Sequence, residues 1–112
     1  MTTSFTPRRR HQGYHGLMSG GLLAAIFDCL HYRISIVLGV LPAVTARMEV
    51  DYRAPIPLGR RLRLEARPVS RRGRVIVSSA VAVLPDGTVA AESKAVYVEV
   101  PMGRLPRRRG IR

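Results

Sequence analysis

The feature of this sequence that most constrains its fold is an almost wholly apolar stretch, SGGLLAAIFDC, at residues 19–29. Helical periodicity continues from this stretch nearly to Gly39, which provides a natural C-terminal stop, and Ser19 is suited to cap the N-terminus. A helix that is apolar nearly all round in its first half must be enclosed by other structure. One carboxylate, Asp28, lies inside the stretch, and removing an ionised carboxylate from water is costly unless it is paired, hydrogen-bonded or protonated. We therefore expect Asp28 to have a specific partner or a specific role.

Four segments after the helix have the pattern of β-strands. They are residues 44–54, 61–69, 74–84 and 88–100. Strict alternation in the first of them places Met48 on the inward face and Thr45 on the solvent-facing side. Residues 1–6 alternate weakly and could form one more short strand. Because a single sheet needs its apolar face covered, the sequence predicts an α+β fold in which one helix lies across about five antiparallel strands.

The chain length of 112 residues suits one domain with one core. We assign residues 1–103 to this domain and residues 104–112 to an arginine-rich C-terminal tail that we expect to be mobile. No run reaches the roughly 18 uninterrupted apolar residues of a membrane span, and the N-terminus lacks the apolar region of a secretory signal. The lone cysteine, Cys29, is expected in the core; it cannot form an intramolecular disulfide or a zinc site by itself, which fits a reducing cytoplasm.

The net charge of +12 comes from 19 basic residues, of which Lys94 is the only lysine. Basic clusters suggest polyanionic partners such as nucleic acid, anionic lipid or a phosphorylated ligand. The arginines are spread along the chain, however, so the coding composition of the genome explains them equally well. The four tyrosines and two phenylalanines are scattered, which leaves no aromatic pair for stacking on bases. We therefore expect no specific nucleic-acid partner and no membrane partner.

Helical spacing places small residues beside Asp28. Gly21 and Ala25 lie to one side of it along the helix face, and His31 and Tyr32 lie to the other. Small residues beside a carboxylate leave room for a cavity. His31 and Tyr32 are more typical of a helix surface and an interface contact than of catalytic groups, and a carboxylate in this setting is more often tied to an arginine or a backbone group than functional.

The glycine pair at the start of the helix can be interpreted in two ways. Gly20 and Gly21 lie where the free N–H groups of a helix point outward, with the positive end of the macrodipole behind them, so they could hold a developing oxyanion. Glycine also allows a ligand to approach the backbone closely. At a helix start, however, such a pair more often serves capping alone, and the residues by themselves leave both interpretations open.

Three stretches carry a family resemblance: HQGYHGLMSGGLLAAIFD, VTARMEVDYRAPIPLG and DGTVAAESKAVYV. The first resembles the QGyPGilHGG…D signature of the hotdog-fold thioesterases, in their phenylacetyl-CoA thioesterase-like branch. The second resembles the strand that follows the helix in that family, with its Y-R-x-P-x-P-x-G ending, and the third resembles the last hairpin. The resemblance covers residues 9–100 and implies a hotdog fold, in which one long central helix is wrapped by a curved antiparallel sheet.

The resemblance also implies an activity and a set of roles. The protein would be an acyl-CoA thioesterase that hydrolyses the thioester of a small or medium acyl-CoA. Asp28 would act as general base or nucleophile, Gly20 would supply the N–H that polarises the thioester carbonyl, and Thr45 would orient the carboxylate or its water. In this family the carboxylate and the amide come from opposite protomers, so a homodimer or a dimer of dimers is implied. Apart from the coenzyme A of the substrate, no cofactor is implied, and no metal.

Further positions bear on substrate binding. The predicted substrate-binding residues are Gly21, Ser19, Gly16, Gln12 and Arg53, the last as one of several arginines that could pair with CoA phosphates. Two departures from the family pattern are Ser19, which replaces the usual histidine, and His15, which stands where proline is common. Relatives also usually carry a segment before the first strand. These departures leave open an alternative function, a non-catalytic hotdog-fold protein that binds acyl-CoA or another ligand.

Overall fold

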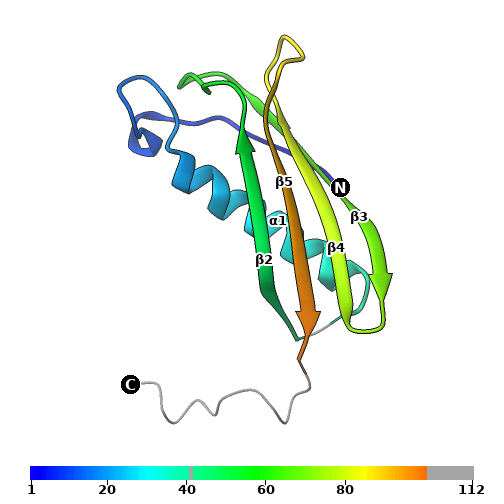
Figure 1. The fold of residues 1–112 in the computed structure, drawn as a ribbon. Helices are drawn as coiled ribbons and strands as arrows, with labels where there is room; N and C mark the ends of the chain where they lie inside the picture. The colour runs from blue at the N-terminus through cyan, green and yellow to red at the C-terminus, as the bar shows by residue number, and fades with distance from the viewer. Residues whose placement is uncertain (41, 101–112) are drawn as a thin grey trace, which may run out of the picture.

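The computed structural model describes residues 1–40 and 42–100, so the tail predicted at 104–112 lies outside the described residues. The elements in chain order are β1 (Thr2–Phe5), a short 3₁₀ turn (Arg9–His11), α1 (Gly20–Val37), β2 (Ala43–Tyr52), β3 (Leu62–Arg72), β4 (Val75–Val83) and β5 (Val89–Glu99) (Figure 1). The strands form one antiparallel sheet in the order β1-β3-β4-β5-β2. The predicted helix and the predicted strands are confirmed, with small shifts at their ends.

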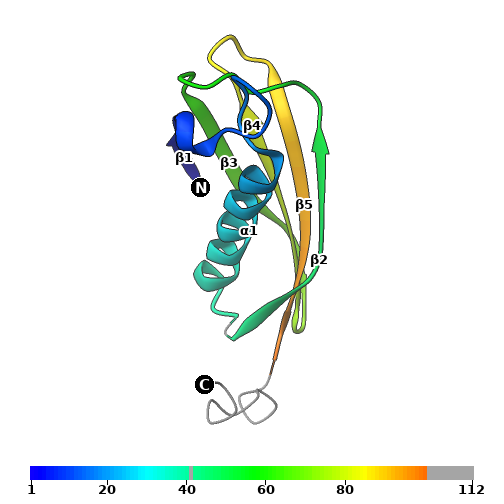
Figure 2. The same ribbon diagram turned by 90° about the vertical axis from the view of Figure 1, so that its left-hand side faces the viewer.

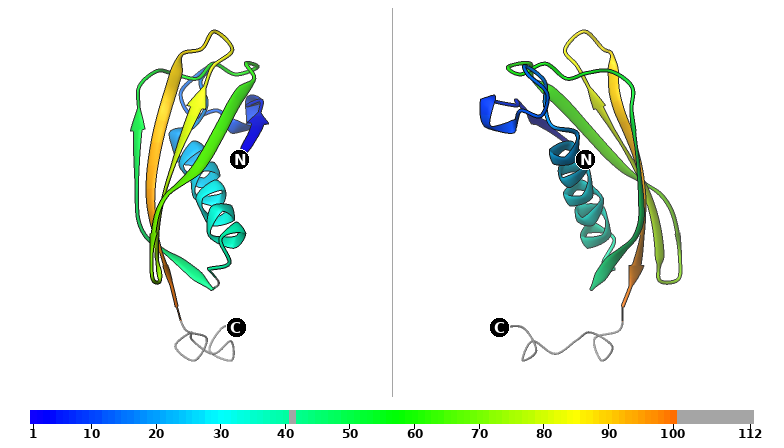
Figure 3. Two further views of the ribbon diagram at one scale, coloured as in Figure 1. Left: turned by 90° about the vertical axis from the view of Figure 1, so that its right-hand side faces the viewer. Right: turned by 60° about the vertical axis from the view of Figure 1, so that its left-hand side comes forward.

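The helix α1 packs across one face of the curved sheet (Figure 2), and the two views of Figure 3 show the sheet bending around it. Its buried stripe consists of Leu23, Phe27, Leu30 and Ile34, which follow helical spacing. They share the main core cluster with inward residues of β3, β4 and β5. By length and composition α1 could also cross a membrane, a property that core helices share; its buried stripe is part of the core.

A single copy of the chain covers only one face of α1, although the apolar composition predicts that the helix is enclosed. Tyr32 and Ile36, one helical turn apart on the uncovered face, are 39% and 43% exposed. The prediction that Cys29 is a core residue is wrong, because Cys29 lies on the opposite side of the helix from Phe27 and is exposed. Within the described residues, one side of α1 therefore presents apolar side chains to solvent.

A β-bulge near the start of β2 decides which of its residues face the helix. Thr45 pairs with Tyr97 of β5, but Ala46 is an extra residue without a partner of its own, and the regular pairing resumes at Arg47. An extra residue reverses the alternation of side chains beyond it. Thr45 therefore lies on the same face as Met48 and reaches α1, contrary to the expected alternation, while its side chain is exposed to solvent as expected.

His31 is also placed differently from the prediction of a surface position. Its side chain is fully buried between α1 and the sheet, where one ring nitrogen is hydrogen-bonded with Ser78 Oγ and the other lies 2.9 Å from Ser93 Oγ. His31 follows Phe27 by four residues and so belongs to the same helix face. Burial lowers the pKa of His31 to about 4, because desolvation disfavours the imidazolium, and the nearby charge of Asp28 opposes this only in part.

Candidate active site

Asp28 is held by two hydroxyl groups that come from the sheet. Thr45 Oγ1 donates a hydrogen bond to Asp28 Oδ1 at 3.0 Å, and the Tyr97 hydroxyl donates to the same oxygen. The side chain is half-buried. The ion pairs found among residues 1–40 and 42–100 all lie elsewhere, so no arginine neutralises this carboxylate there. Among the described residues, neutral hydroxyl donors alone orient the Asp28 side chain.

Tyr97 is the site residue that the sequence prediction missed. It lies directly opposite Thr45 across the β2–β5 pair, and directly paired residues project from the same face of a sheet. The alternation in β5 predicts that Tyr97 faces inward, but it does not predict which helix residue Tyr97 meets. Burial, and next the hydrogen bond to Asp28, raise the pKa of Tyr97, so its hydroxyl remains a protonated donor at neutral pH.

The start of α1 presents free backbone donors. Ser19 caps the helix, since its Oγ accepts a hydrogen bond from the Leu22 N–H at 3.4 Å. Within the part of the chain that the structure describes, the N–H groups of Gly20 and Gly21 have no hydrogen-bond acceptor. The Tyr52 hydroxyl donates to the carbonyl oxygen of Gly20 and so ties the helix start to the end of β2. Two exposed N–H groups at the positive end of a helix can stabilise an oxyanion.

A cavity of about 440 Å³ opens beside this helix start. It is lined by the loop before α1, including Tyr14 and Ser19, by Gly20 at the start of α1, and by residues after β2, including Arg53. This volume is within the range of small-molecule sites. Arg53 lies at its rim with its Nε 2.6 Å from a carboxylate oxygen of Glu92. The structure thus brings three of the residues predicted to bind or polarise the substrate, Ser19, Gly20 and Arg53, to one cavity.

The other residues predicted to bind substrate have different positions. Gly21 is exposed in the first turn of α1. Gln12 and Gly16 shape the loop: Gln12 Oε1 accepts a hydrogen bond from the Gly16 N–H at 2.8 Å, and Gly16 has a positive φ of 78°, which favours glycine. Gln12 and Gly16 do not line the cavity at the helix start. Their contact with substrate stays a prediction.

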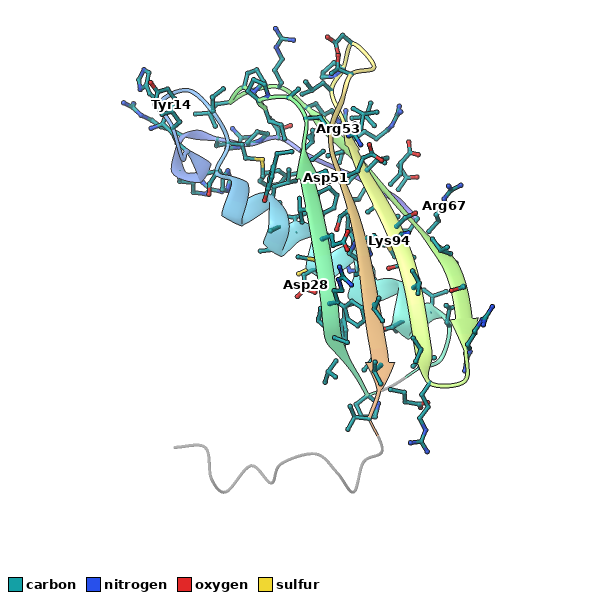
Figure 4. All side chains as sticks on the ribbon, viewed as in Figure 1. Tyr14, Asp28, Asp51, Arg53, Arg67 and Lys94 are labelled. Atoms are coloured by element: carbon teal, nitrogen blue, oxygen red, sulfur yellow. The ribbon has the colours of Figure 1, made fainter. Side chains whose placement is uncertain are left out.

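Asp28 and Gly20 are too far apart to act on one thioester within a single copy. They are eight positions apart on the same helix, which corresponds to about 12 Å along its axis. Figure 4 shows Asp28, from the middle of α1, beside β2 and well away from Tyr14 and Arg53. Reacting atoms must approach to roughly 3–3.5 Å. A site that uses both groups therefore needs the carboxylate of one copy and the amides of another.

Comparison with known proteins assigns the family. The sequence model of the Thioesterase superfamily matches residues 15–91, more than half of the chain. Comparison with curated protein sequences gives no match.

Several solved structures are similar along most of the chain. The protein smu.793 from Streptococcus mutans, bound to acetyl CoA, has a TM-score of 0.83 at 18% identity over 88% of this chain and 79% of its own. A thioesterase described as hypothetical, from Streptococcus pneumoniae with coenzyme A, has a TM-score of 0.82 at 18% identity over 87% and 77%. An Asn→Asp mutant of the phenylacetic acid degradation protein PaaI from Thermus thermophilus has a TM-score of 0.81 at 25% identity over 88% and 84%. The chain has the hotdog fold and belongs to the thioesterase superfamily.

Proposed function

We propose that the protein is an acyl-CoA thioesterase that hydrolyses small or medium acyl-CoA at a site shared by two copies of the chain. The observation that carries this proposal is the Asp28 carboxylate, oriented by Thr45 and Tyr97 without an ion-pair partner among the described residues. The free amides of Gly20 and Gly21 supply the complementary donors. Support also comes from the family and from similar structures that hold acetyl CoA or coenzyme A.

The chemistry follows from these groups. Asp28 accepts a proton from water as the water oxygen attacks the thioester carbon, and the oxygen of the tetrahedral intermediate is stabilised by the Gly20 N–H of the second copy. Collapse of the intermediate breaks the C–S bond, and the proton held by Asp28 passes to the departing sulfur, which yields the free acid and the CoA thiol. Solved mutants of the Streptococcus pneumoniae thioesterase replace an aspartate or a threonine with alanine. These are the residue types of Asp28 and Thr45.

The second copy is proposed to cover the exposed side of α1 and β2. The strand β2 is an edge of the sheet, and an unpaired edge readily pairs with another chain. Exposed apolar side chains occur on the uncovered face of α1, at Tyr32 and Ile36, and on β2 itself, at Val44. An apolar surface of this kind next to an open edge is typical of a protein interface. A partner there would also bury Asp28 further.

Release of free thiol from a panel of acyl-CoA substrates, from acetyl to medium-chain groups, tests the activity directly. We expect turnover with at least one member of the panel. Acyl-CoA binding without turnover by any member would contradict the proposal and support the alternative function, a non-catalytic ligand-binding protein in which Ser19 replaces the usual histidine.

Replacing Gly20 with proline tests the oxyanion role of its amide. Proline is well tolerated at the first position of a helix but has no N–H, and the extended backbone of Ser19 (ψ 130°) suits a residue before proline. We expect kcat to fall roughly 10²- to 10³-fold, the usual cost of one lost oxyanion donor. Gly20→Ala is the matched control: it keeps the N–H and places its Cβ against the same Tyr52 ring, 3.3 Å from Cε1. Equal kcat values in the two variants would contradict the assignment.

Complementation tests the shared site. When the inactive variants Asp28→Asn and Gly20→Pro are co-expressed, half of the dimers are mixed, and each mixed dimer has one site with both intact groups. We therefore expect roughly one quarter of the native activity to return in a two-fold symmetric dimer. The measurement is thiol release by the co-purified mixture against each variant alone. No recovery in mixed dimers would show that both groups act within one copy.

A further inference from the structure

We propose that Tyr97 is a positioning residue for Asp28: together with Thr45 it holds Oδ1 of the carboxylate and leaves Oδ2 as the oxygen that takes the proton from water. The inference rests on the proposed function. It concerns a residue that touches the catalytic group and not the substrate.

The first support is the convergence of both hydroxyl donors on a single carboxylate oxygen. Thr45 Oγ1 and the Tyr97 hydroxyl both donate to Asp28 Oδ1. No side chain or backbone group in residues 1–40 and 42–100 donates to Oδ2. Hydrogen bonds to a carboxylate oxygen stabilise its negative charge, so the oxygen without donors is the more basic one. Proton transfer is thereby assigned to Oδ2.

The second support is the rigidity of the Tyr97 side chain. Its ring is only 2% exposed and packs with Val40, Ile76 and Ala95 in a separate core cluster beneath the helix. The hydroxyl also lies 2.8 Å from the backbone oxygen of Asp28, so its single proton faces two acceptors of the residue that it orients. A buried ring with few accessible rotamers holds a donor in place better than a surface side chain does.

The third support is the β-bulge in β2. Without the extra residue Ala46, Thr45 would point away from the helix, and Tyr97 would be the only hydroxyl of this cross-strand pair near Asp28. Bulges re-aim side chains and are frequent next to active sites. The strand register therefore places two hydroxyl donors, from residues far apart in the sequence, beside the same carboxylate.

The test is Tyr97→Phe, which removes the hydroxyl and keeps the packed ring. We expect kcat to fall roughly ten- to hundredfold, as for a lost hydrogen bond to a charged group, with KM unchanged. The acid limb of the kcat/KM profile should move to higher pH, because the anionic carboxylate loses a donor. Thr2→Val is the matched control. Thr2 lies on β1, at the opposite edge of the sheet from β2, and its hydroxyl makes no hydrogen bond to a described residue, so we expect no change in either measurement.

A measurement on the substrate-free protein separates this inference from the proposed function. A tyrosine hydroxyl proton in a charge-assisted hydrogen bond gives a far-downfield proton NMR signal, which should be absent in Tyr97→Phe and displaced in Asp28→Asn. The inference is overturned if Tyr97→Phe keeps the native kcat and pH profile, or if the native spectrum has no such signal. A native protein that shows the signal but hydrolyses no acyl-CoA would refute the proposed function and leave the positioning of Asp28 by Tyr97 standing.

Discussion

Asp28→Asn should lower kcat for acyl-CoA hydrolysis by roughly 10²- to 10⁴-fold, the contribution of a positioned general base. Asparagine has the same shape, and its carbonyl oxygen can still accept hydrogen bonds from Thr45 and Tyr97, so the fold should persist. The amide cannot accept a proton from water at neutral pH. We therefore expect the affinity for CoA to remain near its native value while turnover is lost.

The measurement pairs thiol-release kinetics with calorimetric titration of coenzyme A. Asp51→Asn provides a matched control, because Asp51 is an exposed aspartate of β2 that lies apart from Asp28 (Figure 4). We expect this control to keep native kcat. Retention of more than a tenth of the native kcat in Asp28→Asn would rule out Asp28 as the general base.

Lowering the pH from about 6.5 to about 4 should destabilise the protein through His31. The pKa of His31 is about 4 in the folded protein and 6.5 in its ordinary state, so between these values the unfolded chain binds more protons. Linkage then requires the free energy of unfolding to fall as the pH falls through this window, by roughly 2–3 kcal/mol for this one group. Below the folded pKa the contribution of His31 stops changing.

Urea unfolding at several pH values across this window provides the measurement. His31→Gln removes the titrating ring and retains polar groups that can bond Ser78 and Ser93, so its stability should depend much less on pH. His15→Gln, at an exposed position in the loop, should keep the native slope. Carboxylates other than Asp28, whose charge acts on His31, contribute equally in all three proteins and cancel in the comparison. An identical slope in His31→Gln would contradict the role of His31.

Much of the fold could be predicted because it depends on local patterns. The helical spacing of apolar residues after Ser19 and the period of two in the later segments reflect the geometry of a helix and a strand, which each segment carries in itself. The sequence alone also singled out Asp28, since an ionised carboxylate in an apolar helix is costly without a partner or a role. The proposed role of Thr45 came from the family resemblance, and strict alternation argued against it.

The residues whose positions were predicted wrongly or missed depend on contacts between distant parts of the chain. His31 and Cys29 belong to a helix that is apolar nearly all round, so its composition does not indicate which side meets the sheet. The extra residue Ala46 becomes visible only once β2 is paired with β5. Tyr97 contacts Asp28 across a separation of 69 residues.

The sequence by itself determined the helix, the strands, their order along the chain and the one carboxylate that needed an explanation. Only the tertiary structure decided which face of α1 is buried and which residues of β2 face the helix. It also decided that Asp28 meets Thr45 and Tyr97. The physical reason is that strand register and helix orientation depend on packing between segments far apart in the chain, and local periodicity contains no information about either.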